Sequence, residues 1–241
     1  MNFKRAALIS TIGTALGALG SFWTAGISIR SITSIQPSWK WWVTPLIVAV
    51  GLLDAMLPLF YFALYRFKGT LKFPKWTRTT ALLVACALGA VFCAEALNFA
   101  QLRIFPTTSQ YFSLFAELCC AVLLFQVHRA EVAQNPTALP RSGPFFAITK
   151  AAGLWGGLWI AIGCFQVVAT PFVYAAVRHI ASGNGRPSPQ FAHMLVRNIE
   201  KFVNVLCLWV TPWLVYTIQR REERAESIAT ESGMTSHPDT A

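Results

Sequence analysis

The longest uncharged stretch of the chain, residues 151–177, reads AAGLWGGLWIAIGCFQVVATPFVYAAV. A helix rises about 1.5 Å per residue and the hydrocarbon layer of a membrane is about 30 Å thick, so about 20 apolar residues can cross it. Because lipid offers no hydrogen bonds, such a stretch satisfies its own backbone N–H and C=O groups only as a helix. Residues 151–177 therefore predict a membrane-spanning helix.

Similar apolar stretches recur along the chain. Of its 241 residues, 55% are hydrophobic and 12% are charged, whereas a soluble domain carries about 25% charged residues. This composition excludes an ordinary soluble enzyme. The sequence predicts an all-α, polytopic membrane helix bundle, with one integral-membrane domain over 1–218 and a polar cytoplasmic tail over 219–241. Its six predicted spans cover residues 6–29, 42–65, 81–100, 111–127, 151–177 and 202–218.

The basic residues predict the orientation, because Lys and Arg near short loops are retained on the cytoplasmic side. Most of the 20 Lys and Arg residues lie beside loops on the side of the N-terminus. The loop after the second span is basic and has no acidic residue; its positive charges are Arg66, Lys68, Lys72, Lys75 and Arg78. We therefore expect both termini in the cytoplasm, and a multi-pass protein of the bacterial inner membrane.

The first span follows a charged start, Lys4 and Arg5, as a secretory signal does. Its apolar part is longer than that of a signal, and no clear Ala-x-Ala site ends it. We expect this helix to be retained. Cleavage would leave five spans, with the C-terminus still inside.

The net charge of +10 does not predict nucleic-acid binding, because the basic residues are spread over helix ends instead of gathering with aromatic residues on one domain. The bilayer is the expected partner, together with a second copy or other membrane proteins. The six Cys lie inside predicted spans without a Cys-x-x-Cys motif, and no two His are placed to face each other, so no metal and no cofactor are expected. Common hydrolase and nucleotide-binding motifs are absent from the sequence, which favours a non-enzymatic role.

Three carboxylates lie inside predicted spans, namely Asp54, Glu95 and Glu117. An ionised acid at the bilayer centre costs about 2.5–3.5 kcal/mol, so it is rare unless it faces the bundle interior and has a function. Asp54 lies near the middle of its span, and Pro58 one turn later predicts a kink that frees carbonyl groups for a ligand. Asp54 is therefore the candidate midplane carboxylate of a substrate or ion pathway.

Glu95 and Glu117 are predicted to lie at similar depth on neighbouring antiparallel helices. If they face each other, both cannot stay ionised, so the pair would hold a proton or capture a cation. Further polar candidates for the pathway lie mostly in the outer half, at Asn98, Gln166 and Asn204. Together these residues are expected to line a cavity that opens away from the cytoplasm.

A purely structural interpretation of these residues also stands. Interhelical hydrogen bonds hold membrane helices together, at about 0.6 kcal/mol each on average, and a protonated Glu can form such a bond without any role in transport. Depth favours a function for Asp54 and Glu95. For Glu117 and Asn204 neither interpretation is favoured.

Glycines at four-residue spacing predict helix contacts. Gly13 and Gly17 form a ridge of small residues on the first span, and Gly153 and Gly157 form another on the fifth. Such ridges let helices approach closely, within one chain or between copies.

Two functions are compatible with this sequence. The first is a small transporter or channel for protons, a cation or a small neutral solute; an anionic substrate is disfavoured because no basic residue lies within a predicted span. The second is a non-catalytic membrane subunit or scaffold of a larger envelope or secretion complex, with the glycine ridges and basic loops as docking surfaces. The carboxylates favour transport.

Overall fold

The computed structural model describes residues 3–35, 40–67, 73–102, 108–129, 143–181 and 189–234. Over these ranges the chain forms helices and no strand. Six helical stretches are long and apolar enough to cross a membrane, which confirms the polytopic helix bundle predicted from the sequence. They run Phe3–Ser31, Val43–Arg66, Lys75–Cys93, Gln110–Arg129, Pro144–Ala175 and Met194–Ala225.

The second span consists of two helices, so the helices in chain order are α1 (Phe3–Ile35), α2 (Lys40–Asp54), α3 (Met56–Arg66), α4 (Lys75–Leu102), α5 (Thr108–Arg129), α6 (Pro144–Ala181) and α7 (Pro189–Met234). The division lies at Ala55. Pro58 has no backbone N–H, so it cannot donate to the carbonyl of Asp54 four residues earlier. The interruption thus falls where Pro58 predicts it, and it places Asp54 at the end of a helix inside the span.

The last helix begins earlier than the predicted span at residue 202. Proline is favoured in the first turn of a helix, and between Pro189 and Pro212 the sequence has neither proline nor glycine to interrupt it. Arg197 and Lys201 consequently lie inside α7 and inside its apolar span Met194–Ala225. The expectation that no basic residue lies within a span stays a prediction, but these two residues belong to the same continuous helix as the sixth predicted span.

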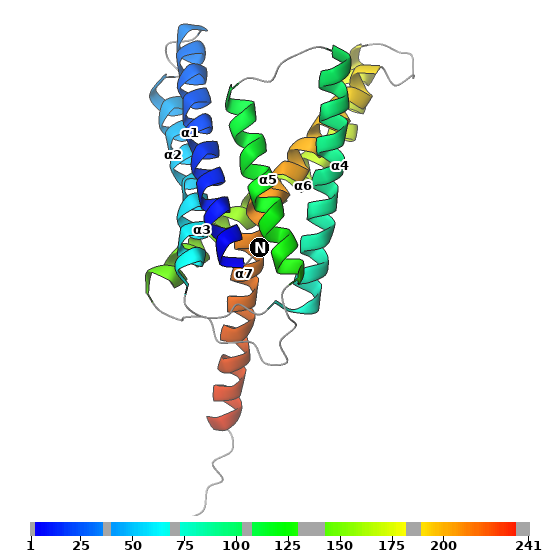
Figure 1. Ribbon diagram of the computed structural model, residues 1–241. Helices are drawn as coiled ribbons and strands as arrows, with labels where there is room; N and C mark the ends of the chain where they lie inside the picture. The colour runs from blue at the N-terminus through cyan, green and yellow to red at the C-terminus, as the bar shows by residue number, and fades with distance from the viewer. Residues whose placement is uncertain are drawn as a thin grey trace, which may run out of the picture.

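The helices form a bundle in which α5 lies between α1 and α4 (Figure 1). α1 packs against α5 and α3, α6 packs along α7, and α4 contacts both α5 and α7. The start of α1 and the end of α7 lie at the same end of the bundle (Figure 1), as an even number of spans requires. We call this the terminal end and the opposite one the far end. Which of them faces the cytoplasm stays a prediction.

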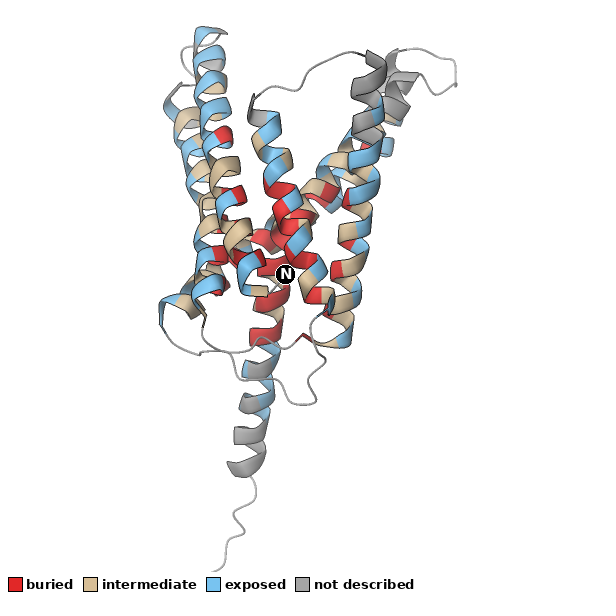
Figure 2. Ribbon diagram, in the orientation of Figure 1, coloured by how far each residue is buried: buried red, intermediate tan, exposed pale blue. Residues whose placement is uncertain are grey.

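The buried residues gather toward the terminal end of the bundle (Figure 2). Phe60, Tyr61, Leu124 and Leu214 are all fully buried there. The Tyr61 hydroxyl donates a hydrogen bond to the carbonyl of Leu208 at 2.8 Å, and thereby joins α3 to α7. Toward the far end, α1 and α2 diverge from α4, α6 and α7, and most residues are exposed or half-buried (Figure 2). The described residues are therefore packed more tightly toward the terminal end than toward the far end.

The glycines of α1 lie against α5. A Cβ atom at Gly13 would be 2.8 Å from Cβ of Cys119, and one at Gly17 would be 3.1 Å from Cβ of Ala116. At the same contact, Ser10 donates a hydrogen bond to the Cys119 carbonyl at 3.0 Å. These two helices approach closely because α1 has no side chain at the point of contact.

The glycines of α6 lie against α7 in the same way. A Cβ atom at Gly153 would be 3.1 Å from the carbonyl oxygen of Pro212, and one at Gly157 would be 3.2 Å from the indole of Trp213. Both predicted ridges thus face another helix of the same chain.

Candidate functional site

Asp54 lies at the break between α2 and α3 and faces α6. The indole N–H groups of Trp155 and Trp159 both donate to its Oδ1 atom, at 3.3 and 3.2 Å. The two tryptophans are four residues apart and therefore share one face of α6; their rings meet edge to face with centroids 5.6 Å apart. Two donors to one oxygen stabilise negative charge on the carboxylate, because hydrogen bonds to ionised groups are about twice as strong as neutral ones.

Sequence analysis did not identify these tryptophans as partners of Asp54. Tryptophan in a membrane protein is normally an interfacial anchor. Trp155 and Trp159 instead lie well inside the span Pro144–Ala175. The four-residue spacing, which places both indoles on one face of the helix, was the available signal for a shared contact.

A small cavity adjoins Asp54. It has a volume of about 70 Å³, and its polar lining includes the hydroxyl-bearing residues Thr14, Ser21 and Ser113. We call it the Asp54 cavity; its lining residues are Thr14, Gly17, Ala18, Ser21, Asp54, Leu57, Ser113, Ala116, Leu208 and Trp209. Carboxylate and hydroxyl oxygens are suitable partners for a proton, a water molecule or a hard cation.

Glu117 lies on α5 with 5% of its surface exposed. The Ser113 hydroxyl donates to its Oε1 atom at 3.0 Å, and the thiol of Cys207 on α7 lies 3.3 Å from its backbone carbonyl oxygen. A buried carboxylate is tolerated in a span when polar groups surround it. Glu117 therefore belongs to the polar contact between α5 and α7.

A larger cavity separates the polar faces of α5 and α7. Its volume is about 320 Å³, and we call it the α5–α7 cavity; its lining residues are Gln110, Ser113, Leu114, Glu117, Arg197, Glu200, Lys201 and Asn204. The structure thus brings together Glu117 and Asn204, which were selected separately from the sequence. Arg197, Glu200 and Lys201 were not selected, because the start of the span was placed after them.

A third cavity, of about 420 Å³, lies between α1, α2 and α5 in the half of the bundle nearer the far end. Its lining is mostly small residues and hydroxyls, namely Gly20, Ser21, Thr24, Ala25, Ser28, Ile47, Gln110 and Ser113. We call it the far-end cavity. Ser113 lines all three cavities, and Ser21 lines the far-end and Asp54 cavities. The three cavities are therefore neighbours around Ser113.

Of the remaining candidates, only Gln166 has a side chain that the structure describes. The side chains of Glu95 and Asn98, on α4, lie outside the part of the chain whose side chains the structure describes, so their pairing with Glu117 stays a prediction. Their helix does pack against α5. Gln166 is exposed on α6 and lines none of the three cavities.

Among the described residues, no group of three His, Cys, Asp or Glu side chains is close enough to hold a metal ion. The cysteines divide between the surface and the core: Cys86, Cys93 and Cys164 are exposed, while Cys119, Cys120 and Cys207 are buried. No family model, no curated protein and no solved structure matches the chain. Its function is therefore inferred from the residues around the three cavities.

Proposed function

We propose that the protein is a small secondary transporter or channel of the bacterial inner membrane, and that Asp54 is its central ion-binding group. The observation that supports this most directly is the position of Asp54, at a helix break inside a span and beside a polar cavity. Ion and substrate sites of many transporters lie at such discontinuous helices near the middle of the bilayer. A proton or a small cation is the ion that a cavity of about 70 Å³ with a carboxylate would take.

The contacts of Asp54 offer a way to couple ion binding to movement. The indole hydrogen bonds from Trp155 and Trp159 connect the break in the second span to α6. Protonation or cation binding neutralises the carboxylate, and a neutral acceptor forms weaker hydrogen bonds than a charged one. An ion at Asp54 thus changes the contact between α3 and α6, which is the differential interaction that a conformational equilibrium needs.

The test is flux through reconstituted protein. Purified full-length protein is placed in liposomes that contain a pH-sensitive or a sodium-sensitive dye, and a gradient of the corresponding ion is imposed. We expect wild-type protein to dissipate one of the gradients and Asp54→Asn to lower that flux by about 100-fold, because the amide holds neither a proton nor a cation at neutral pH.

The matched control is Glu223→Gln, which neutralises an exposed carboxylate of α7 that lines none of the three cavities. Its flux should equal that of the wild type. Wild-type protein that moves neither ion, or an Asp54→Asn variant with normal flux, would contradict the proposal.

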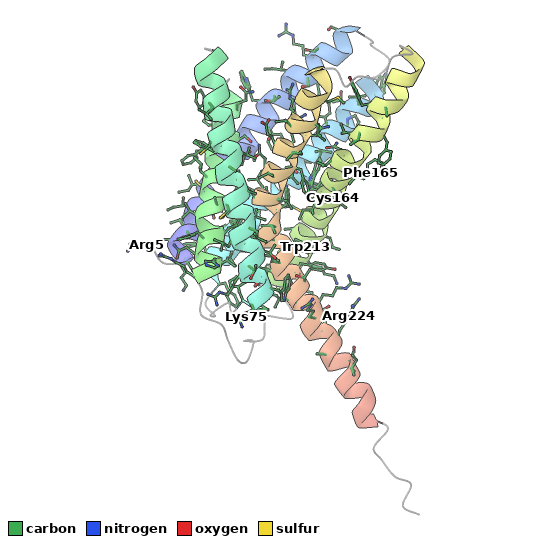
Figure 3. The ribbon with its side chains drawn as sticks, turned by 90° about the vertical axis from the view of Figure 1, so that its right-hand side faces the viewer. Arg5, Lys75, Cys164, Phe165, Trp213 and Arg224 are labelled. Carbon is green, nitrogen blue, oxygen red and sulfur yellow. The ribbon has the colours of Figure 1, made fainter. Side chains whose placement is uncertain are left out.

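A second candidate function is a membrane subunit of a larger envelope or secretion complex. It is favoured by the long uncovered surface of α6. Few residues of the apolar stretch Pro144–Ala175 are buried against other helices, and Phe165 projects outward (Figure 3). Purification from the native membrane in a mild detergent, followed by the mass of the intact particle, separates the two. A fixed set of companion proteins supports the subunit, and recovery alone or as a homo-oligomer supports the transporter.

A further inference from the structure

The α5–α7 cavity is formed by the polar faces of two helices. On α7 the contributing residues follow the i, i+3, i+4, i+7 spacing of one helix face, as Arg197, Glu200, Lys201 and Asn204. On α5 they follow the same spacing, as Gln110, Ser113, Leu114 and Glu117. Polar faces of this kind are rare in membrane spans unless they contact each other or line a path for a polar molecule. Here a volume of about 320 Å³ lies between them.

The charges of this cavity are arranged by depth. Arg197 and Lys201 are exposed, whereas Glu117 is 5% exposed. The amide oxygen of Asn204 is buried and accepts no hydrogen bond from the described residues. The exposed charged residues of the lining are therefore basic, with the half-buried Glu200 between them in the sequence, and the buried groups are hydrogen-bond acceptors.

A molecule that carries both a carboxylate and an ammonium group would complement this arrangement. Arg and Lys bind carboxylates through charged hydrogen bonds. A carboxylate and an amide oxygen are acceptors, and an ammonium group, which has three N–H donors, suits both. A buried acceptor that lacks a donor is unfavourable, so a bound donor next to Asn204 would stabilise the protein.

We propose that the α5–α7 cavity binds a small zwitterionic amino acid, with its carboxylate at Arg197 and Lys201 and its ammonium group at Glu117 and Asn204. Two acidic and two basic residues in the lining match a molecule with one charge of each sign better than they match a simple anion or cation. The volume of about 320 Å³ is at the lower end of the usual range for small-molecule sites, about 300–1,000 Å³.

The claim that this amino acid is a transported substrate rests on the proposed transport function. The claim that the cavity binds it does not depend on transport. A carried solute of this kind would enter from the far end, because Gln110 and Ser113 also line the far-end cavity. It would reach a position that shares Ser113 with the Asp54 cavity, where the driving ion is proposed to bind.

The experiment measures binding without transport. The melting temperature of full-length protein in detergent is recorded with each of the twenty common α-amino acids in turn, at millimolar concentration. We expect at least one of them to raise it, by about 3–6 °C when the amino acid is at ten times its Kd. The methyl ester of the active amino acid lacks the carboxylate, and its N-acetyl derivative lacks the ammonium group; neither should raise the melting temperature.

The variants locate the site. In Arg197→Gln combined with Lys201→Gln, the stabilisation by the active amino acid should be lost, and in Asn204→Ala it should weaken at least tenfold in apparent affinity. Arg224→Gln is the matched control, since Arg224 is an exposed basic residue of the same helix (Figure 3) that does not line the cavity. This control should keep the full response.

Several outcomes would overturn the amino-acid site. They are the absence of stabilisation by all twenty amino acids, an equal response to both blocked derivatives, and an unchanged response in the double variant. Stabilisation by glycerophosphoethanolamine alone would also overturn it, because the cavity would then hold a lipid headgroup. The two proposals fail separately: amino-acid binding without any flux contradicts only transport, and Asp54-dependent flux without amino-acid binding contradicts only this site.

Discussion

Asp54 is the residue whose environment departs most from that of an ordinary membrane span. Its carboxylate accepts two indole N–H bonds from α6 and borders a cavity with three hydroxyl-bearing side chains. A carboxylate that served only to hold helices together would need a single donor. The additional donor and the adjoining cavity distinguish Asp54 from an acid that only holds two helices together.

At the scale of the residue, we predict that the strength of the hydrogen bond from Trp159 to Asp54 depends on the charge of Asp54. Trp159→Phe removes one N–H donor while keeping an aromatic ring, and it should lower the free energy of unfolding by about 1.5–3 kcal/mol, as expected for a hydrogen bond to a charged group. In a background of Asp54→Asn the same change should cost much less. A double-mutant cycle from unfolding in detergent gives the coupling energy.

The control for this cycle is Trp76→Phe. The indole N–H of Trp76 is buried and makes no hydrogen bond to the described residues, so this variant removes an N–H group without breaking such a bond. Equal costs of Trp159→Phe with and without the Asp54 carboxylate would show that the two side chains are not coupled.

Two features of the helices affect the packing of the bundle in opposite ways: the break between α2 and α3 interrupts a helix, and the glycine contacts bring helices close together. Pro58 interrupts the backbone hydrogen bonds of the second span and leaves Asp54 at a helix end. The glycines of α1 instead let it approach α5 closely, and the glycines of α6 let it approach α7 closely. The far-end cavity and the α5–α7 cavity lie along the polar faces of α1, α5 and α7.

At the scale of the element, Gly13→Ala should destabilise the protein by about 1–3 kcal/mol, the usual cost of overpacking. The added Cβ would lie 2.8 Å from Cβ of Cys119 and 3.3 Å from the backbone of Ala116, and neither of these can move independently of α5. Gly26→Ala is the matched control on the same helix, because nothing lies within 4 Å of the position that its Cβ would take. Thermal unfolding in detergent measures both; equal melting temperatures would contradict the close contact of α1 with α5.

Taken as a whole, the described part of the molecule is a helix bundle whose buried residues gather toward the terminal end (Figures 1 and 2). The described basic residues on either side of the loop after the second span, Arg66 at the end of α3 and Lys75 at the start of α4, lie toward the terminal end, whereas the far-end cavity lies in the other half of the bundle. If the terminal end is cytoplasmic, as the basic residues predict, the far-end cavity lies in the outer half of the bundle.

At this scale we predict that short tags at the N-terminus and the C-terminus are both protected from protease in right-side-out membrane vesicles and both cleaved in inside-out vesicles. A tag inserted after α4 is the control and should behave in the opposite way. Tags on different sides would contradict the six spans, and two exposed tags in right-side-out vesicles would contradict only the orientation.

The sequence by itself determined the fold class and the six spans, because the length of an apolar stretch and the cost of unsatisfied backbone groups in lipid are local properties. It also located Asp54 and the break at Pro58, since an acid and a proline inside a span are visible without tertiary structure. Only the tertiary structure decided which polar residues meet. The indoles of Trp155 and Trp159 reach Asp54 across about a hundred residues, and Arg197 and Lys201 join Glu117 because α7 extends past the predicted start of its span. Periodicity gives the face of a helix, but the neighbour of that face depends on how all the helices pack together.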